Sequence, residues 1–174
     1  LLADGMEKIF QIGPCFRANE SGRRHREEFT MLEYYSRGTG YRELAEFTAG
    51  FVAEAAERVL GSTRIEYGGK QIDLSAYEFV TVDDAFRLHA GCTASEADAL
   101  DRFDELMVTK IDPELGNGKL TFLCDYPANR ASLARLRADD PSVAERWELY
   151  IAGIELANAF GELTDAKEQR ERFQ

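Results

Sequence analysis

The sequence predicts an α+β fold, and three observations carry that prediction. Residues 7–17, 28–35 and 144–165 are rich in the β-branched, aromatic and apolar residues of strands. Residues 41–60 repeat apolar side chains at three- and four-residue steps, as an amphipathic helix does. Helical patterns are inserted between long strands and do not alternate regularly with them, which favours an antiparallel sheet with flanking helices.

The amino-acid composition and charge favour some classes of protein and argue against others. The 174 residues are 44% hydrophobic and 30% charged, as in ordinary globular proteins, and the formal net charge is −11. This acidity argues against non-specific nucleic-acid binding. No apolar run approaches the ~20 residues of a membrane span. Three cysteines without a CxxC pair predict reduced thiols in a cytoplasmic protein. Because the chain starts without Met, we expect a piece of a longer protein.

The first element predicted is a hairpin with a long loop. A strand over residues 7–17, with Gly13-Pro14 as a bend or edge feature, leads into residues 18–27. A second strand over residues 28–35 would place Phe29 and Met31 on one face, which Glu33 and Tyr35 would extend. Hairpin loops usually have two to five residues, so the length of this loop suggests a function.

The remaining elements follow in order. Leu44, Phe47, Phe51, Ala55 and Val59 predict the buried stripe of the helix over residues 41–60, which Gly61 ends. A short hairpin turning at Gly68-Gly69, a helix capped by Thr81 and a helix over residues 95–109 capped by Ser95 come next. We then expect a turn and strand over residues 116–127, followed by a polar loop or short helix to residue 142. Two strands joined near Ala152-Gly153 come next, and a helical tail starts at Asp165.

Basic residues gather at the first hairpin loop. Arginine forks match phosphate oxygens, and Arg17 stands at the end of a strand, where an unpaired charge would be costly. Phe29 follows the loop and could stack on a flat heterocycle. The alternative is a solvated charged turn. The cluster consists of Arg17, Arg23, Arg24, His25 and Arg26.

Acidic residues recur in the last two predicted strands. Glu148, Glu155 and Glu162 are spaced seven residues apart in a largely apolar segment, and buried carboxylates need a partner or a metal. Strict alternation would put Glu155 on the face opposite Asn158, Phe160 and Glu162, so both sets meet only if a bulge or the Gly153 turn shifts the register. Solvent-facing acids are an equal alternative. Glu33 with Glu162 could bind an ammonium group.

Two segments carry a family resemblance. "CFRANESGRRHREEFTMLEYY", at about residues 10–35, resembles motif 2 of class II aminoacyl-tRNA synthetases of the lysyl branch. "RWELYIAGIELANAFGELTDAKEQRERF", at about residues 144–165 and beyond, resembles the strands before motif 3. Within that branch, "YPANRASLARLRADDPSVAERWELYIAGIELANAF" looks most like the EpmA/GenX/PoxA ligases. The resemblance implies that residues 1–174 form the central part of a catalytic domain, without motifs 1 and 3.

The resemblance also implies roles for individual residues. Arg17 would act as the catalytic arginine on the α-phosphate of ATP, with Ala18, Asn19, His25, Arg26, Phe29, Glu148 and Leu149 as further ATP-binding residues. Glu148 and Glu155 would hold Mg²⁺. The amino-acid substrate would meet Glu33, Tyr35, Glu155, Asn158, Phe160 and Glu162. Asn19 stands where the family has Glu, with Glu20 one step later, and Arg26-Glu27 replace Asn-Pro.

The implied activity is ATP-dependent formation of an aminoacyl-adenylate from lysine or β-lysine, followed by transfer to a lysine of elongation factor P. The full-length protein would be a homodimer, and the fragment alone would be inactive. Two alternatives remain: the core of a lysyl-tRNA synthetase that charges tRNA-Lys, and a synthetase-like module that binds ATP or an amino acid without chemistry.

Overall fold

The computed structural model describes residues 1–22 and 25–173, and it divides into two compact units. The first unit, Leu1–Thr39, is a hairpin of strands β1 (Lys8–Phe16) and β2 (Glu28–Ser36). The strands pair in an unbroken antiparallel register that sets Cys15 opposite Phe29. The predicted hairpin is therefore confirmed. Arg23 and Arg24 of the predicted basic cluster lie outside the described residues.

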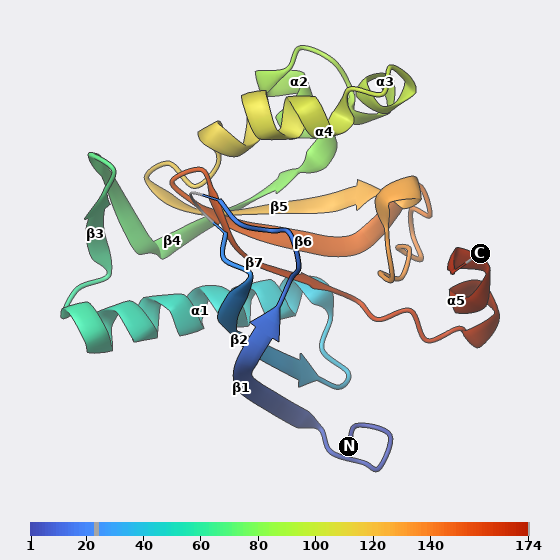
Figure 1. The fold of residues 1–174 in the computed structure, drawn as a ribbon, viewed down its shortest axis with the longest axis horizontal. Coiled ribbons are helices and arrows are strands. Elements are labelled where there is room, and N and C mark those ends of the chain that lie inside the picture. The colour runs from blue at the N-terminus through green and yellow to red at the C-terminus, as the bar shows by residue number, and fades with distance from the viewer. Residues whose placement is uncertain (23–24, 174) are drawn as a thin grey trace. The chain divides into compact units, whose positions relative to one another are not determined.

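The second unit, Gly40–Gln174, contains a five-stranded sheet in the order β3-β4-β5-β6-β7 (Figure 1). The strands are β3 (Arg64–Tyr67), β4 (Lys70–Thr81), β5 (Lys119–Pro127), β6 (Val143–Ile151) and β7 (Ile154–Phe160). All neighbouring pairs are antiparallel except β4 and β5, which are parallel. The α+β prediction is confirmed, with one correction, because the long helical segment between β4 and β5 lets the chain return in the same direction.

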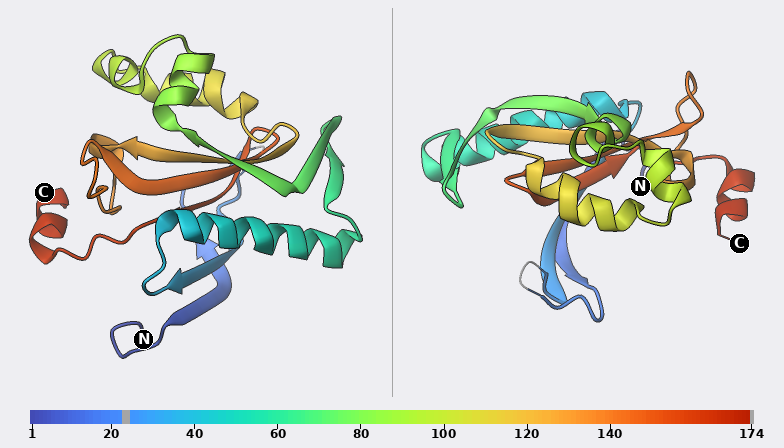
Figure 2. Two further views of the ribbon diagram at one scale, coloured as in Figure 1. Left: turned by 180° about the vertical axis from the view of Figure 1, so that it is seen from behind. Right: turned by 90° about the horizontal axis from the view of Figure 1, so that it is seen from above.

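Helix α1 (Tyr41–Leu60) covers one face of this sheet (Figures 1 and 2). Its bounds and its end at Gly61 agree with the prediction, but the predicted buried stripe is wrong. The buried residues are Ala45, Thr48, Ala49 and Ala56, while Phe47, Phe51 and Val59 are 59%, 46% and 81% exposed. Small side chains let the helix backbone approach Phe122, Trp147 and Leu149 closely.

The opposite face of the sheet is covered by short helical segments between β4 and β5 (Figure 2). They are α2 (Val82–His89), α3 (Ala94–Ala99), α4 (Phe103–Leu106), a π-helical segment (Met107–Ile111) and a 3₁₀ turn (Asp112–Glu114). Thr81 caps α2 as predicted. The single helix predicted over residues 95–109, with Ser95 as its cap, is wrong: Thr93 forms a capping box with Glu96, and Asp101, at φ 53, separates α3 from α4.

The later elements agree with the sequence. A 3₁₀ turn (Ala128–Arg130) follows β5, and α5 (Ala166–Arg172) is capped by Asp165. Asp125 interrupts β5 with a left-handed backbone, at φ 60, and its buried carboxylate accepts hydrogen bonds from Tyr41, Arg42 and Arg137. This carboxylate joins the start of α1, strand β5 and the following loop. None of the helices among the described residues has the length and apolar character of a membrane span.

Two glycines allow the 3₁₀ turn and the β6–β7 turn to approach each other. A Cβ on Gly116 would lie 2.5 Å from the carbonyl oxygen of Tyr150, and a Cβ on Gly153 would lie 3.1 Å from that of Asp112. Hydrogen bonds of 2.8 Å run from the amides of Ala152 and Gly153 to the carbonyls of Gly116 and Leu115. The close approach therefore fixes the 112–116 segment against the strand that begins at Ile154.

We expect Gly116→Ala to destabilise the chain far more than Gly118→Ala. Both glycines have a left-handed backbone, which costs an alanine roughly 1–2 kcal/mol. Only Gly116 also meets backbone atoms, and this clash adds about 1–3 kcal/mol. Urea unfolding of the chain, followed by the fluorescence of Trp147, measures both variants. Equal free energies of unfolding would show that the close approach does not constrain residue 116.

Candidate active site

A register shift places the acids of the last two strands on one face. In β6, Arg146, Glu148 and Tyr150 alternate onto the face opposite α1, while Trp147 and Leu149 pack in the core beside α1. Glu148 pairs with Asn158, but Tyr150 pairs with Glu155, because the register shifts between Leu149 and Tyr150. Since Glu148 and Tyr150 share a face, so do their cross-strand partners. Of the two register shifts that the sequence analysis considered, a bulge or the Gly153 turn, the structure shows a shift within the paired strands.

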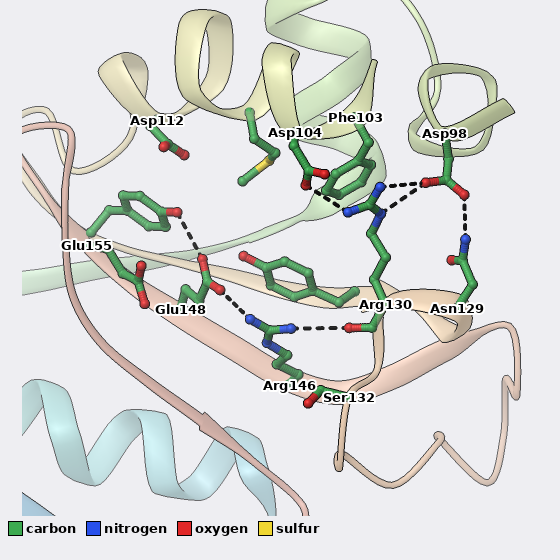
Figure 3. Close-up of a pocket in the computed structure, with 13 residues that line it drawn as sticks. Asp98, Phe103, Asp104, Asp112, Asn129, Arg130, Ser132, Arg146, Glu148 and Glu155 are labelled. Atoms are coloured by element: carbon green, nitrogen blue, oxygen red, sulfur yellow. Dashed lines mark hydrogen bonds and ion pairs between the residues drawn. The ribbon is translucent and has the colours of Figure 1, made fainter. Parts of the chain in front are cut away.

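This face opens into a cavity of about 520 Å³ between the sheet and the helical segments of the second unit (Figure 3). The residues that surround it come from three sources. The sheet provides Tyr126, Arg146, Glu148, Tyr150 and Glu155, the helical segments provide Asp98, Phe103, Asp104, Met107 and Asp112, and the loop after β5 provides Asn129, Arg130 and Ser132.

Glu148 is a buried acid of the cavity whose charge is compensated by neighbouring donors. Its side chain is buried and accepts hydrogen bonds from the guanidinium of Arg146, at 2.5 Å, and from the hydroxyl of Tyr150, at 2.9 Å (Figure 3). Arg146 also donates to the carbonyl of Arg130 at 3.1 Å, and its guanidinium carbon lies 4.3 Å from the ring centre of Tyr126. These contacts hold the carboxylate in one orientation while leaving it on the cavity wall.

Glu155 is held differently. Burial, together with the nearby Glu148 carboxylate, raises its pKa to about 7, although a hydrogen bond with Asn158 acts in the opposite direction. Among the described residues no arginine or lysine forms an ion pair with Glu155. The Glu155 side chain is nevertheless solvent-exposed, as the solvent-facing alternative expected, and a carboxylate beside a second carboxylate favours the binding of a cation between them.

The outer part of the cavity is organised by Arg130. Its guanidinium forms ion pairs with Asp98 at 2.8 Å and with Asp104 at 2.7 Å (Figure 3). It also lies 4.0 Å from the ring centre of Phe103, so its charge is fixed on an aromatic face. Both arginines of the cavity are thus already engaged by acids.

The hairpin unit brings Arg17, just beyond the end of β1, beside Phe29 on β2. The guanidinium carbon of Arg17 lies 5.3 Å from the ring centre of Phe29, and the guanidinium forms an ion pair with Glu20 at 3.5 Å. The sequence argument that an unpaired charge at Arg17 would be costly agrees with its ion pair with Glu20, but the Arg17 side chain is 52% exposed and is not desolvated. Asn19, at φ 64, turns the chain so that the carboxylate one residue later reaches Arg17.

The other predicted residues of this unit are exposed. Ala18, Asn19, His25 and Arg26 lie in the described part of the loop, and Glu33 and Tyr35 lie on β2, opposite Gln11 and Ile9. Phe29 and Met31 are half-buried, whereas Glu33 and Tyr35 are exposed. The face of β2 that these four residues share is therefore only partly buried. The binding roles predicted for residues of this unit stay predictions.

Of the site residues predicted in the second unit, only some lie at the cavity. Glu148 and Glu155 line the cavity, and Asn158 contacts Glu155. Leu149 is completely buried on the α1 side. The remaining two lie beyond the residues that surround the cavity: Phe160 packs against Ala131, Ala134 and Ala144, and Glu162, whose pKa is raised by burial, pairs with Ala134 through the backbone.

Sequence reasoning missed several residues of the cavity. Arg146 and Tyr150 could have been found, because they alternate with Glu148 in the segment Arg-Trp-Glu-Leu-Tyr. Asp112, Tyr126 and Arg130 could not, because they lie in irregular segments or beside the interruption at Asp125, where periodicity gives no face.

The described residues contain no group of three or more His, Cys, Asp or Glu side chains arranged to hold a metal ion. Within the described part of the chain, the cavity therefore offers a pair of carboxylates and no complete metal cage. A pair suits a hard cation that takes its other ligands from water and a substrate.

We expect Arg146→Met to lower the free energy of unfolding by about 3 kcal/mol, because it leaves the Glu148 carboxylate buried without its cation. Arg58→Met is the matched control. Arg58 also pairs with a glutamate, but both side chains are more than half exposed, so the loss should stay below about 1 kcal/mol. Urea unfolding distinguishes them, and similar losses would contradict the importance of burial.

Comparison with known proteins identifies the family. The family model described as "tRNA synthetases class II (D, K and N)" matches residues 1–174. The lysine–tRNA ligase of Xanthomonas oryzae pv. oryzae is 36% identical over 197 residues, covering 100% of this chain and 39% of the relative. That of Chromohalobacter salexigens is 35% identical, covering 99% of this chain and 39% of the relative. The chain spans about two fifths of the length of these relatives, and it belongs to the class II tRNA synthetases of the D, K and N group.

Proposed function

We propose that the protein activates lysine or β-lysine with ATP, forming an aminoacyl-adenylate and pyrophosphate. The observation that carries this proposal is the pair of carboxylates, Glu148 and Glu155, that the β-bulge brings to one face of the sheet. The lysine–tRNA ligase relatives support lysine as the amino acid.

The carboxylate pair fits Mg²⁺ that arrives with a nucleotide. Mg²⁺ is commonly held by one or two carboxylates, together with water and substrate phosphates. Glu148 and Glu155 would hold the ion, which when bound neutralises charge on the phosphate oxygens. Arg146 and Tyr150 keep Glu148 oriented for that role.

The chain's own residues would assist adenylate formation chiefly by orientation and charge. The substrate carboxylate attacks the α-phosphorus, and pyrophosphate leaves. Arg17 would bind the oxygens of the α-phosphate, exchanging its exposed ion pair with Glu20 for the substrate. Phe29, which already holds a planar guanidinium at its face, could stack on adenine. Glu33, Tyr35, Asn158, Phe160 and Glu162 would position the amino acid.

We further propose a lysine side chain of elongation factor P as the acceptor, because "ELAN" and the segment before it resemble the ligases that modify that protein. A specific observation favours a second acceptor, tRNA-Lys: the relatives reported above are lysine–tRNA ligases. The two candidates share the adenylation step and differ only in what receives the aminoacyl group.

The full-length protein, incubated with ATP, a cell lysate and labelled lysine or β-lysine, should transfer label to one protein band that survives ribonuclease. Label that disappears with ribonuclease would assign tRNA as the acceptor and reject the protein acceptor. No label with either amino acid would reject the ligase and support a binding module.

Arg17→Ala in the full-length protein should lower amino-acid-dependent pyrophosphate exchange by about two orders of magnitude or more, because a preorganised charge on the phosphate is lost. Arg37→Ala is the control, since Arg37 is an exposed arginine of the same unit just beyond β2. Undiminished exchange in Arg17→Ala would remove Arg17 from the mechanism.

A further inference from the structure

Asp112 places a third carboxylate in the inner part of the cavity. It comes from the 3₁₀ turn that follows the π-helical segment, and Figure 3 shows it on the helical side, across from Glu155 and Glu148 on the sheet. The three acids thus come from separate elements that only the tertiary fold brings together.

Backbone contacts fix the position of Asp112 relative to the turn that precedes Glu155. Its carbonyl oxygen and the following Pro113 lie against Gly153, where a Cβ would be 3.1 Å from each. The two hydrogen bonds between residues 115–116 and 152–153 tie the same segment to the turn that starts β7. Asp112 therefore cannot shift along the cavity independently of the strand that carries Glu155.

Tyr126 supplies an independent sign of a ligand. Its side chain is 4% exposed and lines the same cavity, and its hydroxyl lies near Glu148 but makes no hydrogen bond of ordinary geometry to any residue that the structure describes. The guanidinium of Arg146 lies over its ring. A buried hydroxyl without a partner is destabilising, so a water molecule or ligand is expected beside it.

The charge of the cavity indicates the kind of ligand. Five carboxylates face two guanidiniums, and both guanidiniums are engaged, Arg130 by Asp98 and Asp104, and Arg146 by Glu148. The inner part therefore attracts a cation. Because the described acids do not form a three-ligand metal group, Asp112 does not complete direct coordination.

We propose that Asp112 is a positioning residue for a hydrated divalent cation at Glu148 and Glu155, accepting hydrogen bonds from its water ligands, and that the Tyr126 hydroxyl binds the same water shell. This proposal rests on the Mg²⁺ site of the proposed function. It suits Mg²⁺, which retains several waters when protein carboxylates bind it. The acid on the helical side would then fix where the cation, and with it the polyphosphate, lies between the two walls.

The experiment measures Mn²⁺ affinity by electron paramagnetic resonance, using the full-length protein with a non-hydrolysable ATP analogue. Asp112→Asn should weaken Mn²⁺ binding about tenfold, as the loss of an outer-sphere partner does. Asp112→Glu should retain most of the affinity, because the carboxylate remains. Asp104→Asn is the matched control: it removes an acid that faces the same cavity but is 82% exposed and engaged by Arg130, and it should leave the affinity unchanged.

Tyr126→Phe keeps the proposal testable if Asp112→Asn fails to fold. It removes only an unpartnered hydroxyl, so the thermal midpoint should be kept or raised while Mn²⁺ binding weakens. An unchanged affinity in both Tyr126→Phe and Asp112→Asn would overturn the proposal. If Asp112→Asn does not fold, an unchanged affinity in Tyr126→Phe suffices to overturn it.

Glu148→Gln and Glu155→Gln separate this inference from the proposed function. If they abolish Mn²⁺ binding while Asp112→Asn behaves as Asp104→Asn does, only the role of Asp112 fails. If they leave Mn²⁺ binding intact, the carboxylate-pair site itself fails, and the role of Asp112 fails with it.

Discussion

The register shift between β6 and β7 is the feature on which the candidate site depends. Without it, Glu155 would point toward α1 and meet a core of Trp147 and Leu149, where a carboxylate has no partner. With it, Glu155 shares a face with Glu148 and Asn158. One extra residue in one strand therefore decides whether the two acids line one cavity or one of them lies unpaired in the core.

The cost of bringing these acids together is offset by groups around them. Arg146 and Tyr150 satisfy Glu148, whereas Glu155 responds to burial and to its neighbour with a raised pKa. Asp125 is compensated in the same way, because three side chains from distant segments donate hydrogen bonds to its buried carboxylate. Buried charge in this unit is placed where several elements meet, so each compensated acid also ties those elements together.

The proposed function uses residues that lie far apart in the sequence. The hairpin carries Arg17 just beyond β1 and Phe29 on β2, and the sheet of the second unit carries the carboxylates. Each group is oriented within its own unit, Arg17 by the ring of Phe29, and Glu148 by Arg146 and Tyr150. Electrostatic catalysis needs such fixed charges, because reorientation during the reaction would cost free energy.

The sequence by itself determined the α+β class, the hairpin, the bounds of α1, the Thr81 cap and the last two strands, because these depend on local periodicity and local caps. It made a shared site for the acids of the last two strands conditional on a bulge or a shift at the Gly153 turn, and it could not decide whether either was present. Tertiary structure alone decided that alanines and not phenylalanines of α1 are buried, that β4 and β5 run parallel, and that Asp112 faces Glu155. These outcomes depend on the shape of a neighbouring surface or on irregular backbone. Neither can be predicted from the spacing of residues along the chain.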